Sequence, residues 1–191
     1  MIRFILTMIV CGIALLVNAQ EEHLKFKGIP ITGDIDSFEI KLKECGFKEI
    51  LHENDGFMME GSFAGKDDAK IMVFASPKTH TTCRIYVLLD VGTTWNSLKT
   101  AYSNYVELFK YKYGKPRDNI ELFSRPYYEG DGYELQAVRN DKCHYITGFS
   151  VLLGYISVSI SNNCKIKIVY EDRKNAQIEV EERKRSIIDD I

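Results

Sequence analysis

Residues 82–90 read TCRIYVLLD, and residues 163–171 read NCKIKIVYE. Laid on each other, the two segments place a cysteine at the second position of both, match Val87 to Ile168, and end on an acidic residue. Apolar residues recur at every second position in both, which is typical of a β-strand with one buried face. The match indicates that the chain contains the same strand twice.

A second pattern also repeats. Asp-Gly followed by an aromatic residue occurs at 55–57 and again at 131–133, and Asp-Gly is a common signal for a turn between strands. An amphipathic helix precedes each set of strands, with apolar residues spaced three and four apart in 35–45 and 95–109. We therefore predict an α+β fold of two tandem repeats, each a helix followed by an antiparallel meander.

The predicted elements divide the chain into a first repeat at 20–90, a second at 91–171, and a charged C-terminal helix or tail at 172–191 that docks weakly or frays. The expected strands are 23–31, 49–52, 57–63, 70–75 and 84–90 in the first repeat, and 121–128, 133–138, 144–151, 155–161 and 165–170 in the second.

A helix with one apolar stripe and a meander with one apolar face must cover each other, which gives a layer of helices on a sheet. Two such sheets can join edge to edge and so remove two exposed edges. The opposite face of the joined sheet, with Ser157, Ser159, Lys165 and Lys167, is then expected to stay open to solvent.

The first residues predict export. Arg3 precedes an apolar run that ends at Val17, and Ala19 follows as a small residue at a cleavage position, which is typical of a signal peptide at 1–19. A membrane anchor is the rival interpretation, but the run is shorter than the roughly 20 residues that a spanning helix needs. We expect a secreted or periplasmic protein with no membrane span after cleavage.

The charge pattern argues against one class of partner. Basic and acidic residues alternate along the chain, and the formal net charge is −2. No basic stripe is present to attract a phosphate backbone. Nucleic-acid binding is therefore not expected.

Four cysteines remain after the expected cleavage, at positions 45, 83, 143 and 164. Export permits disulfides, and four cysteines allow three pairings. If one bridge forms, we expect Cys143–Cys164, because both residues flank the same predicted hairpin. Their spacing matches no zinc signature, and we expect neither a metal nor a cofactor.

FKGIPITG near the start, W-x-x-L-x-x-x-Y leading to KYGKP, and the late IVYEDRKNA resemble motifs of a set of uncharacterised secreted proteins of gut Bacteroidales, over nearly the whole mature chain. That set has no known activity, so no catalytic residue carries over. The doubled helix-and-meander plan is also similar in architecture to β-lactamase inhibitor proteins, a resemblance that favours binding over catalysis but does not fix the function.

Aromatic residues are the main candidates for a binding site. Phe123, Tyr127 and Tyr128 surround Pro126, and such residues beside a rigid proline are typical anchors of protein interfaces. The alternative is that they pack on the long helix. Tyr86 is a further candidate, because alternation places it on the open face of its strand.

Catalytic sites are less well supported. A cysteine nucleophile needs a histidine within hydrogen-bond reach, and His144 beside Cys143 points to the opposite side of a strand. The predicted function is therefore an exported, non-catalytic protein that recognises a protein or peptide through the open sheet face. The alternative is a cell-envelope hydrolase or glycan-binding protein that uses exposed aromatics and the acidic turns with Glu53, Asp55, Glu129 and Asp131.

Overall fold

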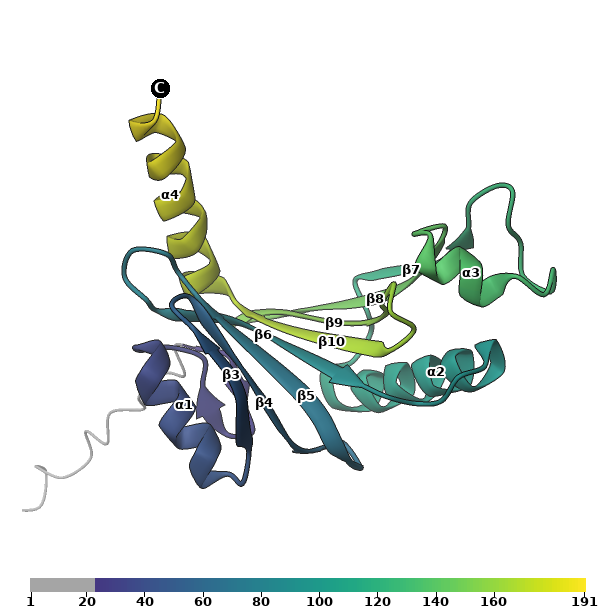
Figure 1. The fold of residues 1–191 in the computed structure, drawn as a ribbon, viewed down its shortest axis with the longest axis horizontal. Helices are drawn as coiled ribbons and strands as arrows, with labels where there is room; N and C mark the ends of the chain where they lie inside the picture. Colours follow the sequence, from purple (N-terminus) through teal and green to yellow (C-terminus); the bar gives the residue numbers. More distant parts are fainter. Residues whose placement is uncertain (1–22) are drawn as a thin grey trace, which may run out of the picture.

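The computed structural model describes residues 23–191. The expected signal peptide lies outside them. The centre of the fold is an antiparallel sheet of eight strands. The strand order is β3-β4-β5-β6-β10-β9-β8-β7 (Figure 1). The strands are β3 (Lys48–Glu53), β4 (Gly56–Phe63), β5 (Lys66–Ala75), β6 (Thr82–Leu89), β7 (Asp118–Phe123), β8 (Cys143–Val151), β9 (Gly154–Ile160) and β10 (Ile166–Asp172).

The order confirms the α+β plan of two tandem repeats. Helix α1 (Ile35–Glu44) precedes the meander β3 to β6, and helix α2 (Trp95–Tyr113) precedes β7 to β10. The last strands of the two meanders, β6 and β10, pair with each other at the centre of the sheet. The two half-sheets are thus joined edge to edge, as expected.

The central register agrees with the sequence match between the two strands. Val87 lies opposite Ile168, and these are the two residues that the match makes equivalent. The match makes Ile85 equivalent to Ile166 and Leu89 equivalent to Tyr170. The cross-strand pair Ile85–Tyr170 therefore corresponds to the cross-strand pair Leu89–Ile166 with the two strands exchanged. A local two-fold axis through the Val87–Ile168 pair therefore relates β6 to β10.

Helices α1 and α2 each begin at a side-chain cap. The Asp34 side chain accepts a hydrogen bond from the Asp36 backbone, and Thr94 and Ser97 form a reciprocal capping box. The buried faces of both helices belong to one hydrophobic core with the alternate strand residues. Helix α1 lies over the first half-sheet and α2 over the second (Figure 1).

One predicted strand is wrong. Residues 133–138 form helix α3 (Glu134–Arg139) in the connection between β7 and β8. Asp131 accepts hydrogen bonds from the backbone of Tyr128 and Tyr133, which fixes a turn that leads into the helix. Phe57 and Tyr133 are therefore not equivalent, although both come directly after an Asp-Gly pair in the first connection of their meander.

Two smaller predictions also need correction. The segment 23–31 is a short hairpin of β1 (Lys25–Phe26) and β2 (Ile29–Pro30) rather than one strand, because Lys27 and Gly28 both adopt positive φ between them. Ser157 is buried rather than open to solvent. Its short side chain lies between the longer Val169 and Tyr155 of the same face.

The predicted disulfide between Cys143 and Cys164 is not formed. All four cysteines within residues 23–191 are free thiols. Cys143 lies in the buried face of β8, whereas Cys164 is in the β9–β10 turn and has its sulfur 4.0 Å from the Leu135 carbonyl oxygen. Cys143 at the start of β8 and Cys164 in the β9–β10 turn lie at the same end of the sheet, but their sulfurs are not bonded.

The C-terminal helix α4 (Arg173–Asp189) follows β10 directly. It packs on the ends of β6, β9 and β10 and rises away from the sheet, on the side opposite α1 and α2 (Figure 1). In the part of the chain that the structure describes, no helix is long and apolar enough to cross a membrane.

Candidate functional site

The face of the sheet opposite α1 and α2, here called the open face, is built from strand residues that alternate with the core. Its central row runs across both repeats in register. No helix lies over the middle of this face within residues 23–191 (Figure 1). From β3 inward, the row contains Leu51, Met58, Met72, Tyr86, Val169 and Ser157.

Apolar side chains dominate the first half of the open face. Leu51 is 49% exposed, and Met58 and Met72 are half-buried. Phe74 lies beside Tyr86, with 4.8 Å between the ring centroids. Because monomeric proteins rarely leave a large contiguous apolar patch uncovered, this half has the character of an interaction surface.

Positive charge lies next to this apolar half. Lys167 has its ammonium group 3.8 Å from the centre of the Tyr86 ring, a cation–π contact. Burial and the nearby Arg84 guanidinium lower the pKa of Lys167. Lys70 and Lys167 lie on either side of Leu88 in the next row. Neither lysine forms an ion pair with a carboxylate of the described chain.

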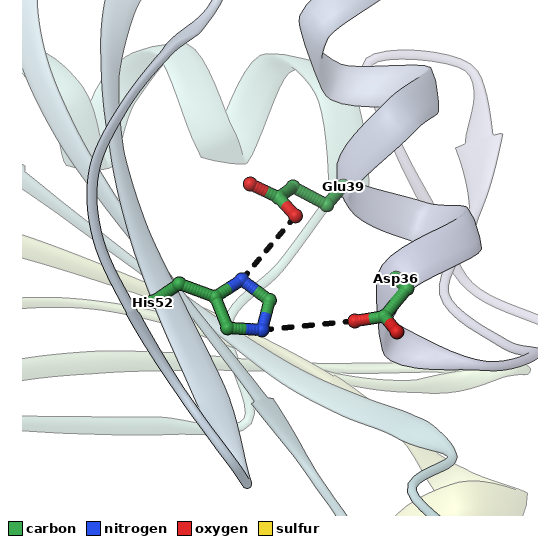
Figure 2. Close-up of side chains that lie close together, drawn as sticks. All are labelled: Asp36, Glu39 and His52. Atoms are coloured by element: carbon green, nitrogen blue, oxygen red, sulfur yellow. Dashed lines mark ion pairs between the residues drawn. The ribbon is translucent and has the colours of Figure 1, made fainter.

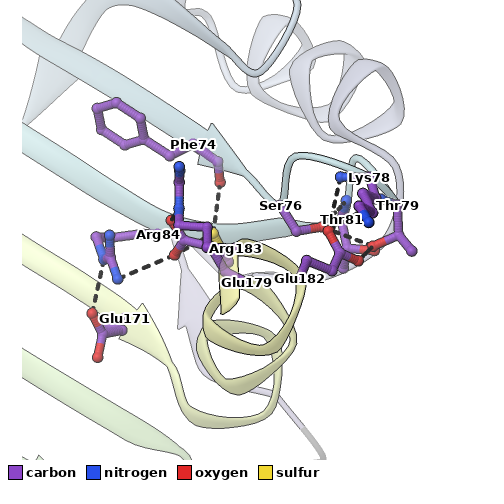
Figure 3. A network of polar contacts seen from close by, with 11 residues as sticks. Phe74, Ser76, Lys78, Thr79, Thr81, Arg84, Glu171, Glu179, Glu182 and Arg183 are labelled. Atoms are coloured by element: carbon purple, nitrogen blue, oxygen red, sulfur yellow. Dashed lines mark hydrogen bonds and ion pairs between the residues drawn. The ribbon is translucent and has the colours of Figure 1, made fainter. Parts of the chain in front are cut away.

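On the other side of the central row, the row that contains Arg84 and Glu171 connects the open face to α4. Arg84 Nε donates to its cross-strand neighbour Glu171 at 2.8 Å, and Arg84 Nη2 lies 3.2 Å from a carboxylate oxygen of Glu179 in α4 (Figure 3). The Cys83 thiol is 3.5 Å from the same carboxylate. Arg84 thus holds the base of α4 against the sheet.

Helix α4 docks mainly through polar residues, with Ala176 as its one buried apolar residue. Asn175, Glu179 and Glu182 are buried, and they have the spacing of a core-facing helix stripe. Glu182 accepts hydrogen bonds from the Lys78 backbone at 2.8 Å and from the Thr79 hydroxyl at 2.7 Å (Figure 3). The large apolar residues of the helix point outward instead. The exposed ones are Ile178, Val180, Ile187 and Ile188.

We expect the docking of α4 to weaken in acid through Glu182. Burial alone raises the pKa of Glu182, but hydrogen bonds from Lys78 and Thr79 outweigh it and hold the pKa below the ordinary value of 4.5. Stability from a depressed carboxyl pKa is present above the unfolded pKa and is lost as the pH falls through the folded pKa. Glu182→Gln should therefore lower the free energy of unfolding by about 1 kcal/mol at neutral pH and flatten its decline in acid.

Urea unfolding across this pH range measures the effect. Glu181→Gln is the matched control, since Glu181 is an exposed neighbour on the same helix. Equal pH profiles for the two variants would contradict the role of Glu182.

A groove lies in the corner between the open face and α4. Its volume is about 580 Å³, and Tyr155 and Glu171 line it from the sheet while Ala176 and Val180 line it from the helix. Ile187 lies seven residues beyond Val180, so it extends the same helix face away from the sheet. This corner groove joins the apolar stripe of α4 to the open face.

The aromatic residues that the sequence predicts for a binding site lie apart from one another in the structure. Tyr86 lies on the open face, as predicted. Phe123 packs edge-on against Trp95 at the border of the core, and the Tyr127 hydroxyl accepts a hydrogen bond from Asn140. Tyr128 is 64% exposed, but it belongs to the β7–β8 connection. The four residues therefore do not form one surface.

The residues considered for catalysis are also dispersed. Asp55 lies in the β3–β4 turn, while Glu129 and Asp131 lie in the β7–β8 connection at the opposite edge of the sheet. Glu129 pairs with Lys99. The structure therefore keeps Glu53 and Asp55 apart from Glu129 and Asp131.

The buried cysteines have the wrong electrostatics for a nucleophile. Burial, together with the Glu179 carboxylate, raises the pKa of Cys83 to about 12, and burial raises the pKa of Cys143 to about 12. A catalytic cysteine needs a lowered pKa, because the thiolate is the reactive form. These two thiols are therefore protonated at neutral pH.

Sequence analysis did not identify the α4 side of the surface. The signal was present, because Asn175, Glu179 and Glu182 occupy the spacing of a buried face. Helix periodicity is usually searched for with apolar residues, and the large apolar residues of this helix point outward.

The chain matches no protein-family model, no curated protein and no solved structure.

Proposed function

We propose that this chain is an exported, non-catalytic binding protein that recognises a protein or peptide through the open face and the corner groove. The observation that carries the proposal is the uncovered apolar row through Met58, Met72 and Tyr86, which continues to the α4 side of the sheet. Side chains of these types form the centres of protein interfaces.

The charges on this surface define the partner further. Lys70 and Lys167 flank an apolar residue and lack carboxylate partners within the described chain. A partner segment that presents a carboxylate beside apolar side chains would satisfy both the lysines and the row. Electrostatic complementarity of this kind contributes mainly to specificity and association rate.

The proposal predicts that Tyr86→Ala and Lys167→Glu each weaken capture of a protein partner by about tenfold or more. The measurement is quantitative affinity capture from an envelope fraction of the source organism, followed by binding of the purified partner. Tyr111→Ala is the matched control, since Tyr111 is 95% exposed on α2, on the other side of the sheet. This variant should capture the partner as the wild type does.

Two outcomes would contradict the proposal. One is a partner whose capture survives both open-face substitutions. The other is turnover of a glycan or peptide that alanine at Glu129 and Asp131 abolishes, which would favour the hydrolase alternative. A glycan array tests the remaining alternative, sugar binding without catalysis.

The proposal also includes export of the protein and its evolutionary relation to other proteins. The apolar run that ends at Val17 supports a secreted or periplasmic location. The doubled helix-and-meander architecture supports a relation to β-lactamase inhibitor proteins, and the motifs FKGIPITG, KYGKP and IVYEDRKNA support a relation to secreted Bacteroidales proteins; both relations are proposed from resemblance alone.

A further inference from the structure

A cluster of metal-ligating side chains lies on the other side of the molecule, between α1 and the edge strand β3. Asp36 and Glu39 occupy one side of α1, and His52 reaches them from β3 (Figure 2). His52 Nδ1 is 3.3 Å from Glu39 Oε2, and His52 Nε2 is 3.7 Å from Asp36 Oδ1. One ligand atom from each residue lies within 4.8 Å of the other two.

Glu39 is the unusual member of this cluster. It is only 6% exposed, and its carboxylate points toward His52 (Figure 2). Its buried Oε1 has no hydrogen bond of acceptable geometry, although the Lys43 ammonium lies 3.0 Å away. That ammonium also bonds Glu49 at 2.8 Å. A buried carboxylate normally requires full compensation by hydrogen bonds or a cation, and Glu39 has it only in part.

We propose that Asp36, Glu39 and His52 form a binding site for a divalent metal of the zinc type. Two carboxylates and an imidazole are ligands that zinc accepts, and a water would complete a four-coordinate site. The imidazole argues against calcium and magnesium, which prefer oxygen ligands alone. With zinc bonds of roughly 2.0–2.2 Å, neighbouring ligands of a tetrahedral site are roughly 3.3–3.6 Å apart, whereas the three ligand atoms here lie within 4.8 Å of one another.

Binding requires a small local adjustment. The two ring nitrogens of His52 face different carboxylates, so the ring or Asp36 must rotate to direct three ligand atoms at one ion. Both side chains have room to do so, since they are 39% and 72% exposed. A pocket of about 570 Å³ beside Asp36 and His52 leaves space for a water ligand. The bound ion would link α1 to β3 and so stabilise the exposed edge of the sheet.

Isothermal titration of the purified protein with zinc chloride tests the site. We expect a single equivalent of zinc to bind, and His52→Ala and Asp36→Asn each to weaken its affinity by about tenfold or more. His80→Ala is the matched control, because His80 pairs with Asp55 across the same pocket and should leave the affinity unchanged. Cobalt should give the visible absorption of a tetrahedral site in the wild type, and magnesium should give no binding.

Two results would overturn the site. One is the absence of zinc binding to the folded wild-type protein. The other is equal zinc affinity in the wild type, His52→Ala and Asp36→Asn, which would place the ion elsewhere. Thermal melting of each variant without metal shows whether it is folded, and Asp36→Asn, at an exposed position, keeps the test valid if His52→Ala unfolds.

Discussion

Replacing Asp172 by alanine is expected to lower the free energy of unfolding by about 2–4 kcal/mol, because the substitution removes a helix cap and leaves a buried backbone donor without a partner. The Asp172 side chain is fully buried. It accepts hydrogen bonds from the Leu24 backbone at 2.7 Å and from the Asn175 backbone at 3.0 Å. One carboxylate therefore ties the N-terminal hairpin to the first turn of α4.

Urea denaturation of Asp172→Ala beside Asp34→Ala separates this role from capping alone. Asp34 caps α1 through the Asp36 backbone and is exposed, so its loss should cost only about 1 kcal/mol. Asp172→Asn, which keeps one acceptor oxygen, should fall between the two. Losses of equal size at Asp34 and Asp172 would show that the link to Leu24 contributes nothing.

Short-range signals account for much of the fold. The apolar spacing in 95–109 predicts α2, and the alternation around Val87 and Ile168 predicts two strands that prove to be central neighbours. Local signals fail where they fix a turn but not the element after it. Asp131-Gly132 forms its turn, yet the next residues enter a helix rather than a strand.

The candidate sites depend on long-range register, which the sequence does not reveal. Tyr86 is predictable on the open face from alternation alone. Its contact with Lys167 depends on the pairing of β6 with β10, and the approach of His52 to Glu39 depends on the position of β3 beside α1. The orientation of α4 is likewise unpredicted, because its buried face is polar.

Gly154→Ala is expected to be among the most destabilising substitutions in the chain, at about 3 kcal/mol. Gly154 begins β9 and lies opposite Asp172 of β10. An added Cβ would collide with the Glu171 carbonyl oxygen, and it would lie 3.2 Å from both the carbonyl carbon and the Leu24 side chain. The carbonyl belongs to a central strand that is paired on both sides, so relief requires the backbone of β10 to move.

Gly148→Ala is the informative control for this substitution, again by urea denaturation. Its Cβ would also meet a neighbour at short range, but that neighbour is the end of the Tyr155 side chain. A rotamer change relieves such a contact at a cost of about 1 kcal/mol. Because Tyr155 lines the corner groove, Gly148→Ala should keep the protein folded while altering the groove. Equal destabilisation by Gly148→Ala and Gly154→Ala would contradict the distinction between a rigid backbone and a movable side chain. It would also mean that the open face is packed more tightly than its half-buried residues indicate.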